Sequence, residues 1–356
     1  MVNPSGRGGR GGRGARLPWL AMWVIAASCG YPALPSLSGS DAPGGVDALE
    51  DAPVVRPPQF TSCMGLAMTC GAGATDSCCR AGMVPGGMFY RSYDGGGYAD
   101  KSYPATVSNF VLDKYEVTVG RFRAFVNAGL GTQASAPAPG AGAHPNLTGS
   151  GWDSAWKTSL VTDTSAFTSA LKCNATYQTW TDAVGANENK PINCVTWYEA
   201  MAFCIWDGGY LPTDAERNYA ASGGNEQRVY PWSNPANSTI IDCSYANYKI
   251  DNPAGMYCVN GTTGAANRVG SESPKGDGKW GHSDLAGNVI EWTLDWYATY
   301  STQCNDCADL TPSSTRVLRD GTFTDVDVSF LHAASRTSGN PSARIYSRGL
   351  RCARAP

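Results

Sequence analysis

The feature of this sequence that most limits how it can fold is its cysteine content, 13 in 356 residues. The first, Cys29, follows a stretch typical of a secretory signal: residues 1–16 are rich in Gly and Arg, and residues 17–28 form a short apolar run. That run is shorter than the ~20 residues that a membrane-spanning helix needs. Removing Cys29 leaves an even number of cysteines, which an exported chain would oxidise to disulfides.

The residues before Cys29 also predict how the chain is anchored. Ala26, Ala27 and Ser28 lead directly into Cys29, which resembles a bacterial lipobox, although the usual Leu three residues before the cysteine is replaced by Ala26. In a lipobox the cysteine is lipidated and becomes the mature N-terminus. We therefore expect a lipid anchor on Cys29 and a location at the bacterial cell envelope. Ordinary signal-peptidase cleavage nearby is the alternative.

Composition divides the rest of the chain. After the leader (1–29), residues 30–60 are rich in Pro, Ala, Ser, Gly and Asp and are expected to form a disordered linker. Residues 61–82 form a Cys-rich segment, and residues 83–356 are long enough for one sizeable domain. The net charge is -3 and no basic stripe is present, so nucleic acid is not expected as a partner.

Helix signals within the domain are few. Thr118 is the expected N-cap of a helix that ends before Gly129, and two capping boxes, Thr196 with Glu199 and Thr213 with Glu216, predict two more helices. The expected strands are short: 110–113, 316–318 and 350–353. The remainder is rich in Gly, Pro, Asn and aromatic residues. This pattern predicts an irregular, loop-rich α+β domain held together by disulfides and aromatic packing.

Several sequence blocks in a fixed order carry a family resemblance. They are VPGGMFY (84–90), FVLDKYEVTVGRFRAFV (110–126), a long block at 191–224, YPWS (230–233), DLAGNVIEWTLDW (284–296), RVLRDGTF (316–323) and RGLRCAR (348–354). In this order they closely resemble the formylglycine-generating enzyme, or sulfatase-modifying factor, family. The resemblance implies a modified C-type-lectin-like fold over roughly residues 83–354.

The resemblance also implies one disulfide, between Cys204 and Cys352. Proximity in sequence suggests three further pairs: Cys173 with Cys194, Cys243 with Cys258, and Cys304 with Cys307. The remaining cluster is expected to form a small disulfide knot or, as the alternative, a zinc site with four thiolate ligands; its members are Cys63, Cys70, Cys78 and Cys79.

The family's catalytic chemistry is not expected here. By resemblance, active members use two cysteines and copper to oxidise a sulfatase cysteine to formylglycine. The matching segment, 319–336, contains no cysteine, and the two positions fall on or near Asp325 and Val328. A carboxylate oxygen is a hard ligand and Val has no donor atom, so a copper cofactor is not expected. We therefore expect a degenerate site near Asp325, Val328 and His332.

Calcium is the expected metal. The resemblance implies a structural calcium site in SDLAGNVIEW, with side-chain oxygens from Asp284 and Glu291 and backbone carbonyls from Gly287 and Val289. Oxygen ligands from a short turn suit Ca²⁺. The alternative is that Asp284 and Glu291 only brace the turn.

These observations favour an exported binding module of the bacterial envelope, without copper-dependent cysteine oxidase activity. Lectin-like ancestry suggests an envelope protein, a peptide or a glycan as its ligand. The alternative function is a re-purposed, oxidoreductase-like enzyme of unknown reaction that uses a groove near Asp325 and His332.

Overall fold

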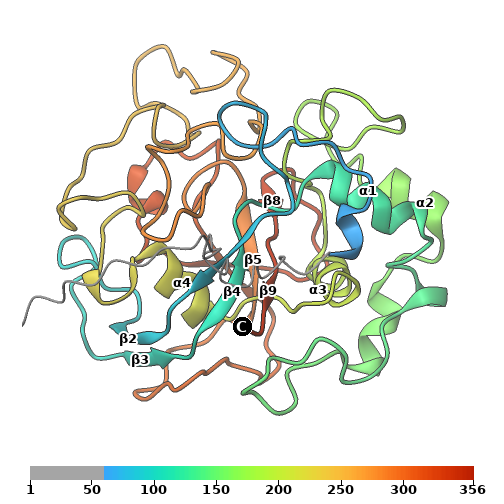
Figure 1. Cartoon of the computed structure of the whole chain (residues 1–356), viewed down its shortest axis with the longest axis horizontal. Coiled ribbons are helices and arrows are strands. Elements are labelled where there is room, and N and C mark those ends of the chain that lie inside the picture. Colours follow the sequence, from blue (N-terminus) through green and yellow to red (C-terminus); the bar gives the residue numbers. More distant parts are fainter. Residues whose placement is uncertain (1–59) are drawn as a thin grey trace, which may run out of the picture. The chain divides into compact units, whose positions relative to one another are not determined.

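The structure is a computed structural model and describes residues 60–356 (Figure 1). The predicted leader, the lipidation site Cys29 and all but the last residue of the predicted linker lie outside the described residues. Within residues 60–356, no helix is both long and apolar enough to cross a membrane.

Four α-helices lie in the described chain, and three begin at the predicted caps. The helices are α1 (Val119–Asn127), α2 (Thr164–Ala170), α3 (Trp197–Trp206) and α4 (Asp214–Ala221). The Thr118 side chain accepts a hydrogen bond from the backbone of Arg121 at the start of α1. Both predicted capping boxes are present, at the starts of α3 and α4. Each cap satisfies backbone N–H groups that the first helical turn leaves without partners.

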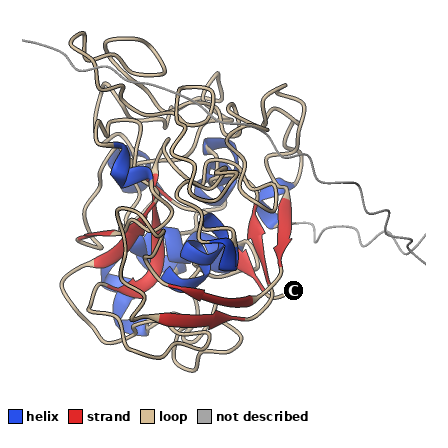
Figure 2. Ribbon diagram, turned by 90° about the vertical axis from the view of Figure 1, so that its left-hand side faces the viewer, coloured by secondary structure: helices blue, strands red, loops and turns tan. Residues whose placement is uncertain are grey.

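The strands are short and form three small sheets. One sheet has the order β1 (Ala81–Val84), β4 (Phe110–Asp113) and β9 (Ala353–Arg354), and a second pairs β2 (Gly87–Tyr90) with β3 (Pro104–Val107). The third has the order β7 (Thr337–Gly339), β6 (Arg316–Arg319), β5 (Ile290–Trp296) and β8 (Arg348–Gly349). All pairs are antiparallel except β5 with β8. Loops make up most of the remaining chain, as Figure 2 shows, so the predicted loop-rich α+β class is confirmed.

The predicted strand at 350–353 is wrong for most of its length. The structure places β8 before it and begins β9 only at Ala353. Backbone carbonyls in this segment accept hydrogen bonds from elsewhere in the fold: Leu350 accepts from Val117 in a loop, and Cys352 accepts from Asp113 at the end of β4. The Arg351 and Cys352 side chains are both fully buried, which holds this irregular stretch in place.

Six disulfides join every cysteine of the described residues. Four of them join pairs suggested from the sequence: Cys204–Cys352, Cys173–Cys194, Cys243–Cys258 and Cys304–Cys307. In the Cys-rich segment, Cys63 pairs with Cys79 and Cys70 with Cys78, so these four residues form a disulfide knot and the zinc alternative is wrong. This number of disulfides indicates an oxidising environment.

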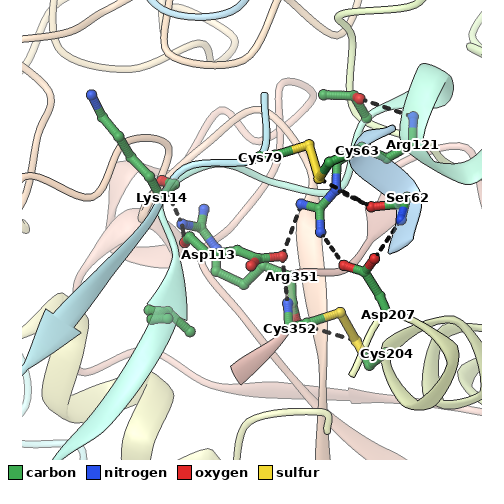
Figure 3. A network of polar contacts seen from close by, with 12 residues as sticks. Ser62, Cys63, Cys79, Asp113, Lys114, Arg121, Cys204, Asp207, Arg351 and Cys352 are labelled. Carbon is green, nitrogen blue, oxygen red and sulfur yellow. Dashed lines mark hydrogen bonds and ion pairs between the residues drawn. A yellow bond between two sulfur atoms is a disulfide. The ribbon is translucent and has the colours of Figure 1, made fainter. Parts of the chain in front are cut away.

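A buried ionic network connects the Cys-rich segment to the domain (Figure 3). Asp207 follows α3, and its carboxylate accepts from Arg121 at 2.6 Å, from Arg354 at 2.7 Å and from the backbone of Ser62 at 2.7 Å. Arg121 also donates to Asp113 at 2.9 Å and to the Ser62 hydroxyl. Because every charge in the network has an opposite partner, its burial does not leave an isolated ion in the core.

Candidate functional site

A cleft of about 280 Å³ opens where strand β6 ends. Its walls come from two continuous stretches, 318–322 and 335–338, and from six further residues: Ile290, Asp325, Phe330, Ile345, Ser347 and Arg348. The walls carry many hydroxyl groups, and the Phe330 ring beside them is 48% exposed. An apolar ring next to convergent polar groups is typical of ligand-binding clefts.

Two carboxyl groups belong to this cleft. Asp320 is only 4% exposed, has a φ of 99°, and accepts a hydrogen bond from Arg217 at 2.6 Å. Burial raises the pKa of Asp320 to about 7, although the Arg217 charge opposes that shift. Asp325 accepts a hydrogen bond from the backbone of Thr322 at 2.8 Å, and burial also raises its pKa. The positive φ of a non-glycine residue is a strained conformation of the kind often found at functional sites.

Three arginines line the cleft, Arg319, Arg336 and Arg348, and their surroundings differ. Arg319 and Arg336 are both paired, because each donates to the Asp214 carboxylate. Arg348 has no carboxylate within salt-bridge distance among residues 60–356, and its buried Nη1 has no hydrogen-bond partner there. Its guanidinium lies 5.0 Å from the Trp292 ring centroid, and burial lowers its pKa. Among the residues that the structure describes, Arg348 is therefore the cleft arginine that is free to bind an anion.

Glycine at position 339 makes room for this arginine. A Cβ at Gly339 would lie 2.7 Å from the Arg348 guanidinium, closer than real Cβ contacts allow. Strand β7 thus approaches the guanidinium closely only because residue 339 has no side chain.

The three residues of the predicted degenerate site are not brought together. Asp325 lines the cleft, but Val328 begins a short 3₁₀ helix (Val328–Leu331) that turns the chain away. Val328 packs against a separate buried cluster, and His332 bonds to Asp94 at 2.8 Å. His332 is not among the residues that line this cleft, so the expected groove near Asp325 and His332 stays a prediction.

No thiol is free in the described chain to replace the missing pair. Segment 319–336 contains no cysteine, and every cysteine of residues 60–356 lies in a disulfide. The predicted absence of a thiolate copper ligand from 319–336 follows from the sequence itself. The sequence reasoning missed Arg348, and the only local signal for it was its place in the RGLRCAR block.

The four predicted calcium ligands lie in the turn that leads into β5. Glu291 accepts hydrogen bonds from Arg217 at 2.9 Å and from Arg351 at 2.8 Å. Asp284 accepts one from the backbone of Gly270 at 2.6 Å. Two arginines thus already neutralise Glu291, whereas no arginine side chain of residues 60–356 bonds to the Asp284 carboxylate.

The charges around this turn nevertheless fit a cation. Burial, followed by the negative charges of Asp284 and Glu291, raises the pKa of Glu116 well above its usual range. Burial also raises the pKa of Asp284 to about 8. Among residues 60–356, no three His, Cys, Asp or Glu side chains are grouped to hold a metal ion. A calcium ion here would therefore need backbone carbonyls, such as those of Gly287 and Val289, as well as Asp284.

Comparison with known proteins identifies the scaffold. The family model for the sulfatase-modifying factor enzyme 1-like domain matches residues 72–356. The chain belongs to this family. It is 27% identical over 308 residues to the formylglycine-generating enzyme of Thermomonospora curvata, covering 77% of this chain and 92% of that enzyme. It is also 33% identical over 167 residues to inactive C-alpha-formylglycine-generating enzyme 2 of Bos taurus, covering 46% of this chain and 50% of that protein.

A solved structure supports the family fold. PvdO from Pseudomonas aeruginosa superimposes with a TM-score of 0.52 at 18% identity, over 78% of this chain and 95% of PvdO. At that identity the likeness concerns the fold alone. The predicted family and its modified lectin-like fold are thus confirmed.

Proposed function

We propose that this chain is an exported binding module of the bacterial envelope, whose cleft binds an anionic group of an envelope peptide, protein or glycan. The single observation that carries the proposal is Arg348, a half-buried guanidinium in a cleft rich in hydroxyl groups, with no carboxylate partner in the described part of the chain. A guanidinium in such a site gains most from a carboxylate, sulfate or phosphate that supplies its missing partner.

The proposal excludes the copper-dependent oxidation of the family's active members. Soft thiolate ligands hold copper(I), and segment 319–336 has carboxylates and hydroxyls where such thiolates would be needed. A relative of this chain is the inactive C-alpha-formylglycine-generating enzyme 2 of Bos taurus, so likeness to the family alone does not imply the reaction. This part of the proposal is therefore supported by the side chains of segment 319–336, none of which is a thiol.

A binding experiment with a matched control tests the role of the cleft. Fluorescently labelled acidic peptides and their amidated counterparts would be titrated against the full chain, the Arg348→Met variant and the Lys157→Met variant. Lys157 is exposed and lies outside the cleft, so the two variants lose the same charge at different places. We expect Arg348→Met to weaken binding of the acidic peptides at least tenfold, and Lys157→Met to leave it unchanged. Equal weakening in both variants, or no preference for acidic peptides, would refute the proposal.

A second candidate function is an enzyme of unknown reaction that uses Asp320 in acid–base chemistry. It is favoured by the raised pKa of Asp320, about 7, in the same cleft. Carboxyl titration by carbon-13 NMR tests it: if Asp320 and Asp325 both titrate below pH 5, acid–base chemistry loses its support.

Anchoring through Cys29 remains part of the proposal. Its support is the leader sequence and the disulfide-rich domain, which suits an oxidising compartment. Cells fed a fatty-acid analogue should label the wild-type protein but not the Cys29→Ala variant. Equal labelling of both would remove the lipid anchor.

A further inference from the structure

The disulfide between Cys304 and Cys307 differs from the other five. It spans a sequence separation of 3, whereas the others span between 8 and 148 residues. The restraint that a disulfide places on an unfolded chain grows with loop length, so this bridge contributes least to stability. Two cysteines separated by two residues are also the spacing found in many thiol–disulfide oxidoreductases.

The bridge lies at a large cavity. A cavity of about 720 Å³ is lined by Cys307 together with the aromatic side chains of Trp296 and Tyr300 and the apolar side chains of Leu310 and Pro312. Cys307 is half-buried and lines this cavity, whereas Cys304 is 8% exposed and packs into the core. Cys307 is therefore the sulfur that a substrate in the cavity would reach first.

A buried arginine contacts the same sulfur. Arg91 is 4% exposed, and its Nη1 lies 3.4 Å from Cys307 Sγ. Its Nη2 donates to the Ser301 carbonyl at 2.6 Å, and its guanidinium lies 4.4 Å from the Tyr300 ring centroid. Its Nε has no hydrogen-bond partner, and no carboxylate lies within salt-bridge distance of it among residues 60–356. Arg91 is thus a buried cation with no directly bonded carboxylate among residues 60–356, and a thiolate at Cys307 would lie within hydrogen-bond distance of it.

The turn that carries the bridge is held by bonds that do not depend on it. Thr106 in β3 donates its backbone N–H to the Cys304 carbonyl at 2.9 Å and accepts from the backbone of Asp306 at 2.9 Å. The Asp306 carboxylate accepts from the backbone and the hydroxyl of Ser108, each at 2.6 Å, and from Asn146 at 2.8 Å. These contacts would keep the two sulfurs close together after reduction, as a reversible dithiol requires.

From these observations we propose that Cys304 and Cys307 form a redox-active pair that exchanges disulfides with a dithiol-containing polypeptide segment bound in the cavity. A substrate thiolate attacks Cys307 Sγ, which forms a mixed disulfide and releases the Cys304 thiolate, and this thiolate takes up a proton. The second substrate thiol, as a thiolate, then attacks the substrate sulfur, and Cys307 leaves as a thiolate beside Arg91. The substrate loses two electrons and becomes a disulfide, while the cysteine pair gains two electrons and becomes a dithiol.

The first experiment uses the full chain and an internal control. The oxidised protein would be equilibrated in glutathione buffers of increasing reducing power, quenched with acid and alkylated, and each cysteine peptide would be quantified by mass spectrometry. Cys243–Cys258 is the control, because both of its sulfur-bearing residues are half-buried and so no less accessible than the proposed pair. We expect Cys304 and Cys307 to be reduced in buffers that leave the control oxidised. Joint resistance of both bridges across all buffers would overturn the proposal.

The second experiment separates a redox role from a structural one. Replacing Arg91 with Gln removes the charge that favours the Cys307 thiolate, and about a tenfold fall in the equilibrium constant for reduction by glutathione is expected. Arg91→Lys keeps the charge and should restore most of that loss. An unchanged equilibrium constant in a folded Arg91→Gln variant would contradict the proposal.

The third measurement holds even if Arg91 variants do not fold. In the Cys304→Ser variant, Cys307 is left as a single thiol, and its rate of alkylation by iodoacetamide would be followed against pH. The charged groups that line the cavity with it are Arg91, Arg336, Asp295 and Asp309. We expect the rate to reach half its maximum well below the pH of about 8.5 typical of free cysteine. A midpoint at or above that pH would overturn the proposal.

Discussion

The disulfide between Cys204 and Cys352 is expected to stabilise the domain far more than the bridge between Cys304 and Cys307. It ties α3 to the segment before β9 across a sequence separation of 148, whereas the other separation is 3. The chain-entropy model assigns about 5 kcal/mol to the long loop and about 2 kcal/mol to the short one. Unfolding entropy for a domain of this size is roughly 0.6 kcal/mol per kelvin, so the melting temperature should fall by about 8 °C and about 3 °C respectively.

The assay compares two double variants with the parent protein. Cys204→Ala with Cys352→Ala removes the long bridge, and Cys304→Ala with Cys307→Ala removes the short one. Thermal unfolding would be followed by circular dichroism under conditions in which all three proteins unfold reversibly. Equal losses in the two variants would refute the argument, because loop length would then not govern what each bridge contributes.

Three further predictions concern charge and metal. Asp207→Asn should lower the free energy of unfolding by about 3–5 kcal/mol in a urea titration, because it leaves two buried guanidinium groups short of a counter-charge. The control is Asp182→Asn at an exposed ion pair, which should not move the urea midpoint. Burial raises the pKa of Asp284 to about 8, so between pH 5 and pH 8 the folded state holds a proton that the unfolded state has lost. Without calcium, the free energy of unfolding should therefore fall as the pH rises through this range. A calcium ion bound at Asp284 would replace that proton, so adding calcium should raise the melting temperature more at pH 8 than at pH 5. A gain of equal size in Asp284→Asn would exclude Asp284 as a ligand. When the full chain is supplied with Cu(I), oxygen and a sulfatase-motif peptide, the peptide cysteine should stay unoxidised, because segment 319–336 has no thiol to hold copper. Mass spectrometry of the peptide checks this, and formation of formylglycine would disprove it.

The sequence predicted most accurately those structural features that depend on residues close together in the chain. The caps at Thr118, Thr196 and Thr213 are local, because each side chain bonds to the backbone three residues later, and all three helices begin where expected. The family blocks predicted the fold for a similar reason, since each block is a short pattern that can be read without knowing its partners in space.

The sequence predicted the cleft poorly, because its properties depend on which charges pair across the fold. Asp325 and His332 are seven positions apart, yet a single 3₁₀ turn sends His332 to Asp94 and leaves Asp325 in the cleft. Arg336 and Arg348 look alike in the sequence, but Asp214 neutralises only the first. Whether an arginine is paired with a carboxylate can be told only once the positions of its possible partners in the fold are known.

The cleft and the cavity beside Cys307 share one lining residue, which links the two proposals. Arg336 lines both, so a ligand in the cleft and a polypeptide in the cavity would both lie close to this residue. The segment 319–336 has no cysteine, while the neighbouring loop carries a pair at a spacing suited to reversible oxidation. If both proposals hold, Arg348 would retain an anionic part of a partner while Cys307 reacts with a thiol of the same partner nearby. An acidic peptide that also contains two cysteines should then be oxidised faster than its amidated, neutral counterpart, and Arg348→Met should abolish that difference without changing the glutathione equilibrium of the pair.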